Sequence, residues 1–160
     1  MLLSSDGLTT TLLESCTGRR VRLQHAAHAT VPARSAPSGA AGLLGLGPGD
    51  ELVVRRSTLV TDDGREVSAN HVVARIDLPG AECLTDPATL LGSALHAAGT
   101  GFRRTVLDVG LRDWDGSPVR PAAFKTYLLW HHDIPAVAIS ELFNPEIIPA
   151  DRTADHEAIR

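Results

Sequence analysis

A β-hairpin is the strongest structural signal in this chain. Residues 51–60 and 66–76 are rich in β-branched and apolar side chains, and Asp62-Asp63-Gly64 lies between them. Asp-Gly is a favoured pair in short hairpin loops, because both residues tolerate the backbone angles that such loops require. The sequence therefore predicts two antiparallel strands joined by a tight turn.

Four further segments have the composition of strands: residues 20–30, 102–111, 124–131 and 134–143. Asp115-Gly116-Ser117-Pro118 supplies a turn between the second and third of them, and His132-Asp133 supplies one between the last two. Strands that follow one another through short turns pair in antiparallel fashion. We therefore expect one antiparallel sheet instead of alternating βαβ units.

Two helices complete the predicted pattern. A short helix capped by Asp6 begins the chain, and residues 85–98 place apolar side chains at helical spacing. Residues 31–50 are rich in Pro, Gly, Ala and Ser, which is typical of a long loop, either a lid over a pocket or a disordered segment. The prediction is an α+β fold in a single domain over residues 1–150, with a polar C-terminal tail at 151–160.

The composition excludes several classes of function. A formal net charge of −4 is unlike that of a general nucleic-acid binder, and no apolar run reaches the roughly 18 residues of a membrane span. No signal peptide is evident, so we expect a cytoplasmic protein in which Cys16 and Cys83 are free thiols. The histidines and cysteines lack the spacing of a metal site, so none is predicted.

Two charged residues interrupt apolar strand faces. Glu141 points to the same side of its strand as Ile139 and Phe143, and Arg56 shares a face with several apolar residues. An inward acid and an inward base in a small β-rich protein suggest a pocket for an anionic ligand. A buried ion pair between two strands is the alternative, and the adjacent Arg55 would point inward if the register were shifted by one residue.

The order of several short motifs extends this interpretation over most of the chain. Four landmarks carry the resemblance: Gly7-Leu8-Thr9 followed by Leu12, Val54-Arg55-Arg56-Ser57-Thr58-Leu59-Val60 ahead of Asp63-Gly64, Leu91-Gly92, and Ser140-Glu141-Leu142-Phe143-Asn144-Pro145. In this order and spacing, the chain resembles the chorismate pyruvate-lyase (4-hydroxybenzoate synthase) family from about residue 7 to residue 149.

The resemblance implies a six-stranded antiparallel sheet with helices on one side, enclosing a pocket that needs no cofactor. It implies that Arg56 and the backbone amide of Leu91 hold the carboxylate of the substrate. Glu141 would lie at the opposite end beside the ring oxygen, and Leu8 would add a contact from the first helix. Residues 31–50 would correspond to a flap over the pocket.

The expected function is that of a carbon–oxygen lyase, with Arg56 and Glu141 as catalytic residues. It would convert chorismate to 4-hydroxybenzoate and pyruvate for aromatic acid biosynthesis or secondary metabolism, with an aromatic or cyclohexadienyl carboxylate as its partner.

Two alternatives stay open: a related enzyme with another substrate in a natural-product pathway, and a non-catalytic small-molecule-binding domain. The second arises because ligand-sensing domains of some transcription regulators are similar in fold. The lack of an attached helix-turn-helix segment counts against a regulator, and the carboxylate of Glu141 favours an enzyme.

Overall fold

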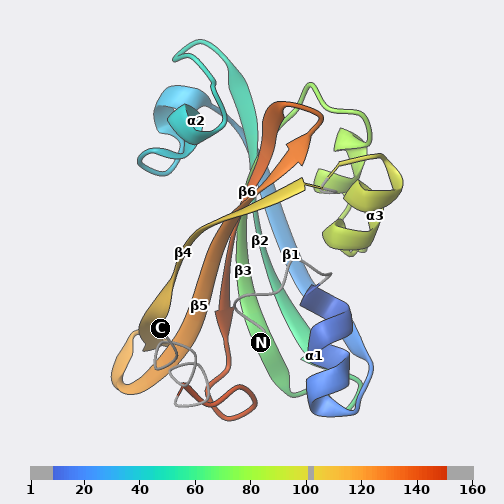
Figure 1. Cartoon of the computed structure of the whole chain (residues 1–160), viewed down its shortest axis with the longest axis vertical. Coiled ribbons are helices and arrows are strands. Elements are labelled where there is room, and N and C mark those ends of the chain that lie inside the picture. Colours follow the sequence, from blue (N-terminus) through green and yellow to red (C-terminus); the bar gives the residue numbers. More distant parts are fainter. Residues whose placement is uncertain (1–8, 101–102, 151–160) are drawn as a thin grey trace, which may run out of the picture.

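Six strands form one antiparallel sheet in the computed structural model, which describes residues 9–100 and 103–150 (Figure 1). The strand order across the sheet is β1-β2-β3-β6-β5-β4. This arrangement confirms the predicted α+β class and the six-stranded antiparallel sheet. The strands are β1 (Val21–Pro32), β2 (Glu51–Thr61), β3 (Glu66–Arg75), β4 (Arg103–Trp114), β5 (Ser117–His131) and β6 (Ile134–Phe143).

Local turn chemistry explains two of the strand connections. Gly64, between β2 and β3, has a φ of 86°, which glycine adopts without a steric penalty. Asp115 and Gly116 have φ values of 57° and 69° and close the hairpin between β4 and β5, where Trp114 pairs with Ser117. Two successive residues with positive φ form the two-residue turn whose twist matches that of antiparallel strands.

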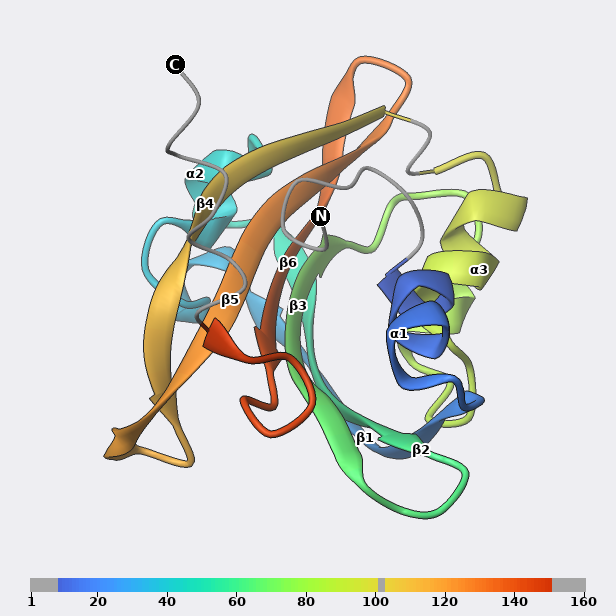
Figure 2. The ribbon, with the colours of Figure 1, turned by 60° about the horizontal axis from the view of Figure 1, so that its bottom comes forward.

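The helices lie on both faces of the sheet. Helix α1 (Thr9–Thr17), the 3₁₀ helix η2 (Ala81–Leu84) and helix α3 (Leu91–Ala97) cover the face around which the sheet curves (Figure 2). The 3₁₀ helix η1 (Ala33–Ser35) and helix α2 (Ala40–Leu43) pack on the other face. Helix α3 is shorter than the helix expected over residues 85–98. The segment 31–50 contains two short helices, η1 and α2, that were not predicted.

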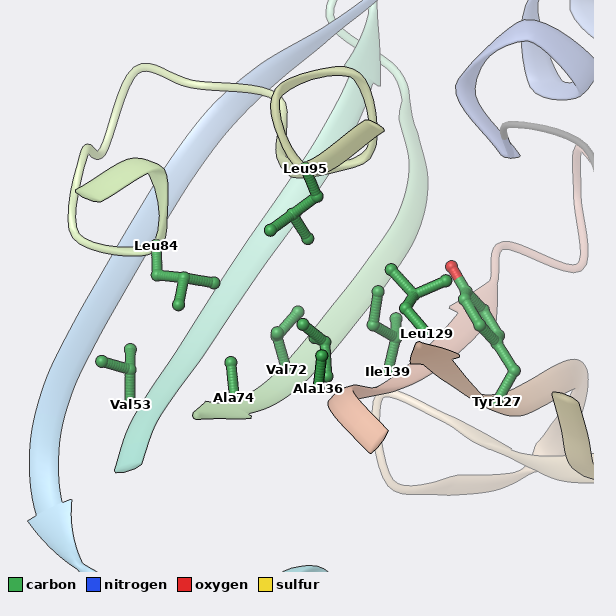
Figure 3. Close-up of a cluster of buried hydrophobic side chains, with 10 residues drawn as sticks. Val53, Val72, Ala74, Leu84, Leu95, Tyr127, Leu129, Ala136 and Ile139 are labelled. Atoms are coloured by element: carbon green, nitrogen blue, oxygen red, sulfur yellow. The ribbon is translucent and has the colours of Figure 1, made fainter. Parts of the chain in front are cut away.

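Apolar side chains form clusters on each face. Under α3 and η2, Leu84 and Leu95 point down onto the sheet (Figure 3). A second cluster lies beneath α1 around the fully buried Leu13. On the opposite face, α2 contributes Ala40 to a third cluster, which includes Leu44 from the residue after the helix. Because both faces of the central strands are apolar at one end, burial alone does not tell which face holds a pocket.

Candidate functional site

A small cavity lies between the curved face of the sheet, α1 and the chain that leads into α3. It contains about 60 Å³ of space open to water. Thr9 and Thr10 of α1 line one side, and residues 89–92 line another. The sheet contributes an apolar floor that includes Val72, Leu129 and Ile139. Several polar and charged side chains interrupt this floor, and these decide what the cavity can bind.

Arg55 on β2 is the buried cation of the cavity, with only 1 % of its surface exposed. Its Nη1 donates hydrogen bonds to the carbonyl oxygens of Cys83 and Asp86, both at 2.8 Å, and to that of Leu84 at 3.3 Å. Its Nη2 donates to the Thr89 carbonyl oxygen at 2.8 Å. The guanidinium thus ties the segment between η2 and α3 to the sheet.

The Nε of Arg55 has a different environment from the two Nη atoms. It is buried and makes no hydrogen bond within the part of the chain that the structure describes. Burial lowers the pKa of the guanidinium, while the nearby Asp86 carboxylate opposes this shift. Arginine nonetheless stays protonated in proteins. Arg55 therefore brings to the cavity a positive charge and one N–H group that has no acceptor among the described residues.

The prediction that Arg56 faces the pocket is wrong, because the register is shifted by one residue. Arg56 is exposed on the opposite face of β2, where it pairs across the strands with His71. The apolar residues assigned to its face, among them Leu52 and Val54, pack near α2. That face is apolar because a helix covers it, and the pocket lies on the other side.

Glu141 on β6 lies in the cavity, where the sequence placed it, and is 6 % exposed. Its Oε2 accepts a hydrogen bond from Thr9 Oγ1 at 3.0 Å, and its Oε1 accepts one from the Tyr127 hydroxyl at 3.1 Å. Burial raises the pKa of the Glu141 carboxyl, and the two hydrogen bonds with the charges of Lys125 and Arg104 oppose that shift. Tyr127 remains a proton donor, because burial and the nearby Glu141 raise its pKa far above neutrality.

A row of polar side chains runs across the sheet through Glu141, and its members Ser57, Asn70 and Glu141 line the cavity. Ser57, Asn70, Glu141 and Lys125 lie directly opposite one another on β2, β3, β6 and β5. The Oδ1 atom of Asn70 is buried without a hydrogen-bond partner among the residues described. Sequence reasoning missed this row because its members come from four strands, and only the register brings them together.

Arg104 is a further cation of the cavity, and the sequence did not predict it. It lines the cavity from β4, and its guanidinium carbon lies 4.7 Å from the centre of the Tyr127 ring. A cation at this distance from an aromatic face is favourably placed. The cavity thus has arginines on two strands that are far apart in the strand order.

The other predicted site residues have mixed outcomes. Leu91 lines the cavity at the first residue of α3, as the resemblance implied. Leu8 lies outside the described residues. Residues 31–50 do not form a flap over this cavity, because Ala33, Ala40 and Leu44 pack on the other face of the sheet.

Two classes of feature are missing from residues 9–100 and 103–150. No three His, Cys, Asp or Glu side chains gather there as the ligands of a metal ion would. No helix in these ranges has the length and apolar character needed to cross a membrane.

We expect the raised pKa of Glu141 to give the protein a characteristic pH dependence. Native Glu141 keeps its proton at pH values where the unfolded carboxyl, near its usual 4.5, has lost it. The native state then binds more protons, so the free energy of unfolding falls as pH rises between the two pKa values. In the Glu141→Gln variant, the free energy of unfolding should not show this fall as pH rises. Urea unfolding across a pH series measures the difference, and parallel curves for both proteins would contradict it.

Comparisons with known proteins place the fold among domains of transcriptional regulators. No family model matches the chain, and no curated protein matches it in sequence. The effector domain of PhnF from Mycobacterium smegmatis matches with a TM-score of 0.68 and 18 % identity, covering 89 % of this chain and 91 % of that one. The chain spans 65 % of the longer PhnF structure.

Two further structures are similar. The C-terminal domain of the histidine utilization repressor from Pseudomonas syringae pv. tomato has a TM-score of 0.61 at 13 % identity, over 80 % of this chain and 94 % of that chain. The ligand-binding domain of a GntR-family transcriptional regulator from Bordetella bronchiseptica has a TM-score of 0.59 at 18 % identity. This match covers 78 % of this chain and 82 % of that chain.

These comparisons correct the functional prediction. The chorismate lyase-like fold is confirmed, because it is the fold of these effector domains. The prediction of a carbon–oxygen lyase is wrong: the similar structures described above are effector and ligand-binding domains of regulators. The catalytic roles assigned to Arg56 and Glu141 fall with it.

Proposed function

We propose that this chain is a non-catalytic ligand-binding domain whose cavity takes a small anionic molecule. The observation that carries the proposal is Arg55, a buried cation that lines the cavity and whose Nε has no hydrogen-bond partner among the described residues. The carbonyl groups bound to its Nη atoms carry no net charge, so they do not neutralise the guanidinium. A carboxylate or phosphate oxygen would supply an acceptor for this donor and would add to the partial compensation of charge that the Asp86 carboxylate provides.

The rest of the cavity indicates what the other end of the ligand carries. The Oδ1 atom of Asn70 and the carboxyl of Glu141 are acceptors, and the Tyr127 hydroxyl already donates to Glu141. A ligand hydroxyl or ammonium group would satisfy these acceptors, while apolar side chains such as Ile139 would contact its body. A hydroxylated aromatic or cyclohexadienyl carboxylate has this pattern.

The size of the cavity implies a conformational change on binding. About 60 Å³ is room for a few waters, each of which needs about 10–15 Å³ by this measure. Pockets for drug-sized ligands are larger, at about 300–1,000 Å³. We therefore expect helix α1 or the segment 85–90 to move outward when a ligand binds. An effector domain needs such a change, because a ligand shifts a conformational equilibrium only by binding one state better.

The similarity to regulator domains supports a role for this chain in the regulation of transcription. The similar structures include effector and ligand-binding domains of transcriptional regulators. We infer that ligand binding to this chain likewise controls a transcription-regulating function in the cytoplasm, with DNA as the target of the complete regulator.

A binding screen with defined anions tests the proposal. Isothermal titration calorimetry with 4-hydroxybenzoate, shikimate, glucosamine 6-phosphate and inorganic phosphate should identify at least one that binds. Arg104→Met and Asn70→Leu should weaken that binding by about tenfold or more, because each removes a polar group from the cavity. Arg56→Met is the matched control on the opposite face and should leave the affinity unchanged. Binding that responds only to Arg56→Met, or no binding of any of these anions, would contradict the proposal.

A further inference from the structure

A second cavity lies at the end of the sheet where β4 begins and β5 turns into β6, beside the C-terminal end of α3 (Figure 1). It contains about 350 Å³ of space open to water, against about 60 Å³ in the first cavity, which holds Arg55 and Glu141. Pockets for small organic molecules begin at about 300 Å³. Among the described residues the two cavities have no lining residue in common, and the second is lined by Ala98, Gly99, Arg103, Trp130, His131 and His132.

The larger side chains around the second cavity all end in a planar group. Trp130 contributes an indole, His131 and His132 contribute imidazoles, and Arg103 contributes a guanidinium. The guanidinium carbon of Arg103 lies 3.9 Å from the centre of the Trp130 ring. The centres of the two imidazole rings lie 4.5 Å apart, with the edge of one ring towards the face of the other. Planar groups of these kinds stack favourably on a planar ligand.

Two of these rings are held in place by threonines. Thr100 is fully buried, and its Oγ1 lies 3.0 Å from Nδ1 of His131. The His131 ring is therefore oriented, and Nε2 is the nitrogen that can contact a ligand. The indole Nε1 of Trp130 donates a hydrogen bond to Thr105 Oγ1 at 3.0 Å. Groups that are fixed in advance lose less conformational freedom when a ligand binds.

His132 has a backbone conformation that glycine would adopt more easily. Its φ is 53°, in the turn between β5 and β6. A side chain at such a φ meets the following carbonyl group, which costs roughly 1–2 kcal/mol. Residues held in this conformation often lie at ligand-binding positions. A histidine here is therefore better explained by a role in the cavity than by the needs of the turn.

We propose that the second cavity binds a planar aromatic molecule that carries one acidic group. Arg103 supplies a permanent positive charge, and its planar fork matches the two oxygens of a carboxylate. Its Nη1 lies 3.5 Å from Oδ1 of Asp133, but both side chains are more than half exposed, so this ion pair is weak and can give way to a ligand. The N–H groups of His131 and His132 add donors for the acid, while the rings stack on the body of the ligand.

Isothermal titration calorimetry of the full chain tests both features of this ligand. Nicotinate and quinaldate are planar and anionic, nicotinamide is planar and uncharged, and cyclohexanecarboxylate is anionic but not planar. We expect one of the planar acids to bind at least about tenfold more tightly than either control compound. Nicotinate should also quench the fluorescence of Trp130, because the other tryptophan, Trp114, is buried. No binding of the planar acids, or equal binding of all four compounds, would overturn the proposal.

Substitution of Arg103 assigns the binding to this cavity. Arg103→Met should weaken binding of the planar acid by about tenfold or more, because it removes the positive charge. Arg112→Met is the matched control: Arg112 also lies on β4, with its guanidinium carbon 3.7 Å from the centre of the Phe124 ring, and its loss should leave the affinity unchanged. Asn70→Leu in the first cavity should also have no effect. A loss with Asn70→Leu and none with Arg103→Met would overturn this proposal and leave the proposed function standing.

His132→Gly separates binding from folding. Glycine adopts a positive φ without a steric penalty, so this variant should keep or raise the melting temperature while the affinity for the planar acid falls by about tenfold. Asp115→Gly makes the same backbone change in the turn between β4 and β5, where φ is 57°, and should leave the affinity unchanged. A His132→Gly protein that binds the acid as tightly as the unmodified chain would contradict the place of this turn in the site.

Discussion

Arg55→Met is expected to lower the free energy of unfolding by about 3–5 kcal/mol, the scale seen when one partner of a buried charged network is removed. Four backbone carbonyl oxygens accept hydrogen bonds from this guanidinium, and methionine would leave them without their donor inside the protein. The segment between η2 and α3 would then lose its main polar attachment to the sheet. Urea unfolding monitored by circular dichroism measures the loss.

Arg56→Met is the matched control for this experiment, since the two arginines are adjacent in sequence and point to opposite faces. Arg56 is exposed, so its replacement should change the free energy of unfolding by about 0.5 kcal/mol or less. Arg55→Lys should fall between the two, because a lysine keeps the charge and replaces the planar fork by one ammonium group. A larger loss for Arg56→Met than for Arg55→Met would reverse the assignment of the two faces.

The strands were predictable because their determinants are local. Strand β6 has the predicted bounds, 134–143, and β2 and β3 each differ from prediction by one residue at one end. Alternating apolar residues and the turn residues around Gly64 act over a few positions, so a sequence pattern captures them. Helix α2 was missed for the converse reason. Its four residues lie in a Gly-, Pro- and Ser-rich segment, and its helical form depends on packing against a sheet formed elsewhere in the chain.

The candidate site was predictable only where a single strand defines it. Glu141 could be assigned because one carboxylate interrupts an otherwise apolar strand. Arg55 could not be chosen over Arg56, because β2 carries apolar residues on both faces. The apolar residues on the face that packs against α2 made Arg56 the apparent inward residue. Asn70 and Arg104 required the register between strands, which no single segment encodes.

Function was harder to predict than fold for a similar reason. The described parts of the four landmarks lie mainly on β2, on β6 and at the starts of α1 and α3, so they chiefly report how the chain folds. Effector domains of regulators share that fold, and one fold supports many functions. What favours ligand binding is the chemistry of the cavity: a buried cation with an N–H group that lacks an acceptor, and a carboxyl group held by two hydroxyl groups.

Leu13→Ala is expected to lower the free energy of unfolding by about 2–5 kcal/mol, because Leu13 is fully buried beneath α1 and alanine would leave a hole there. Residues such as Leu59 and Phe143 surround it on the sheet. Urea unfolding again measures the change. Leu43→Ala is the matched control, since that leucine is 43 % exposed on α2, and its loss should be below about 1 kcal/mol.

The same variant tests how a ligand enters the cavity. Thr9 of α1 lines the cavity and donates to Glu141, so α1 holds that side closed. If α1 is the part that moves, loosening it through Leu13→Ala should raise the association rate of a bound anion, measured by stopped-flow fluorescence, while Leu43→Ala should not. An unchanged rate in the folded Leu13→Ala protein would instead place the entrance at the segment 85–90, where the hydrogen bonds of Arg55 would have to break before a ligand could enter.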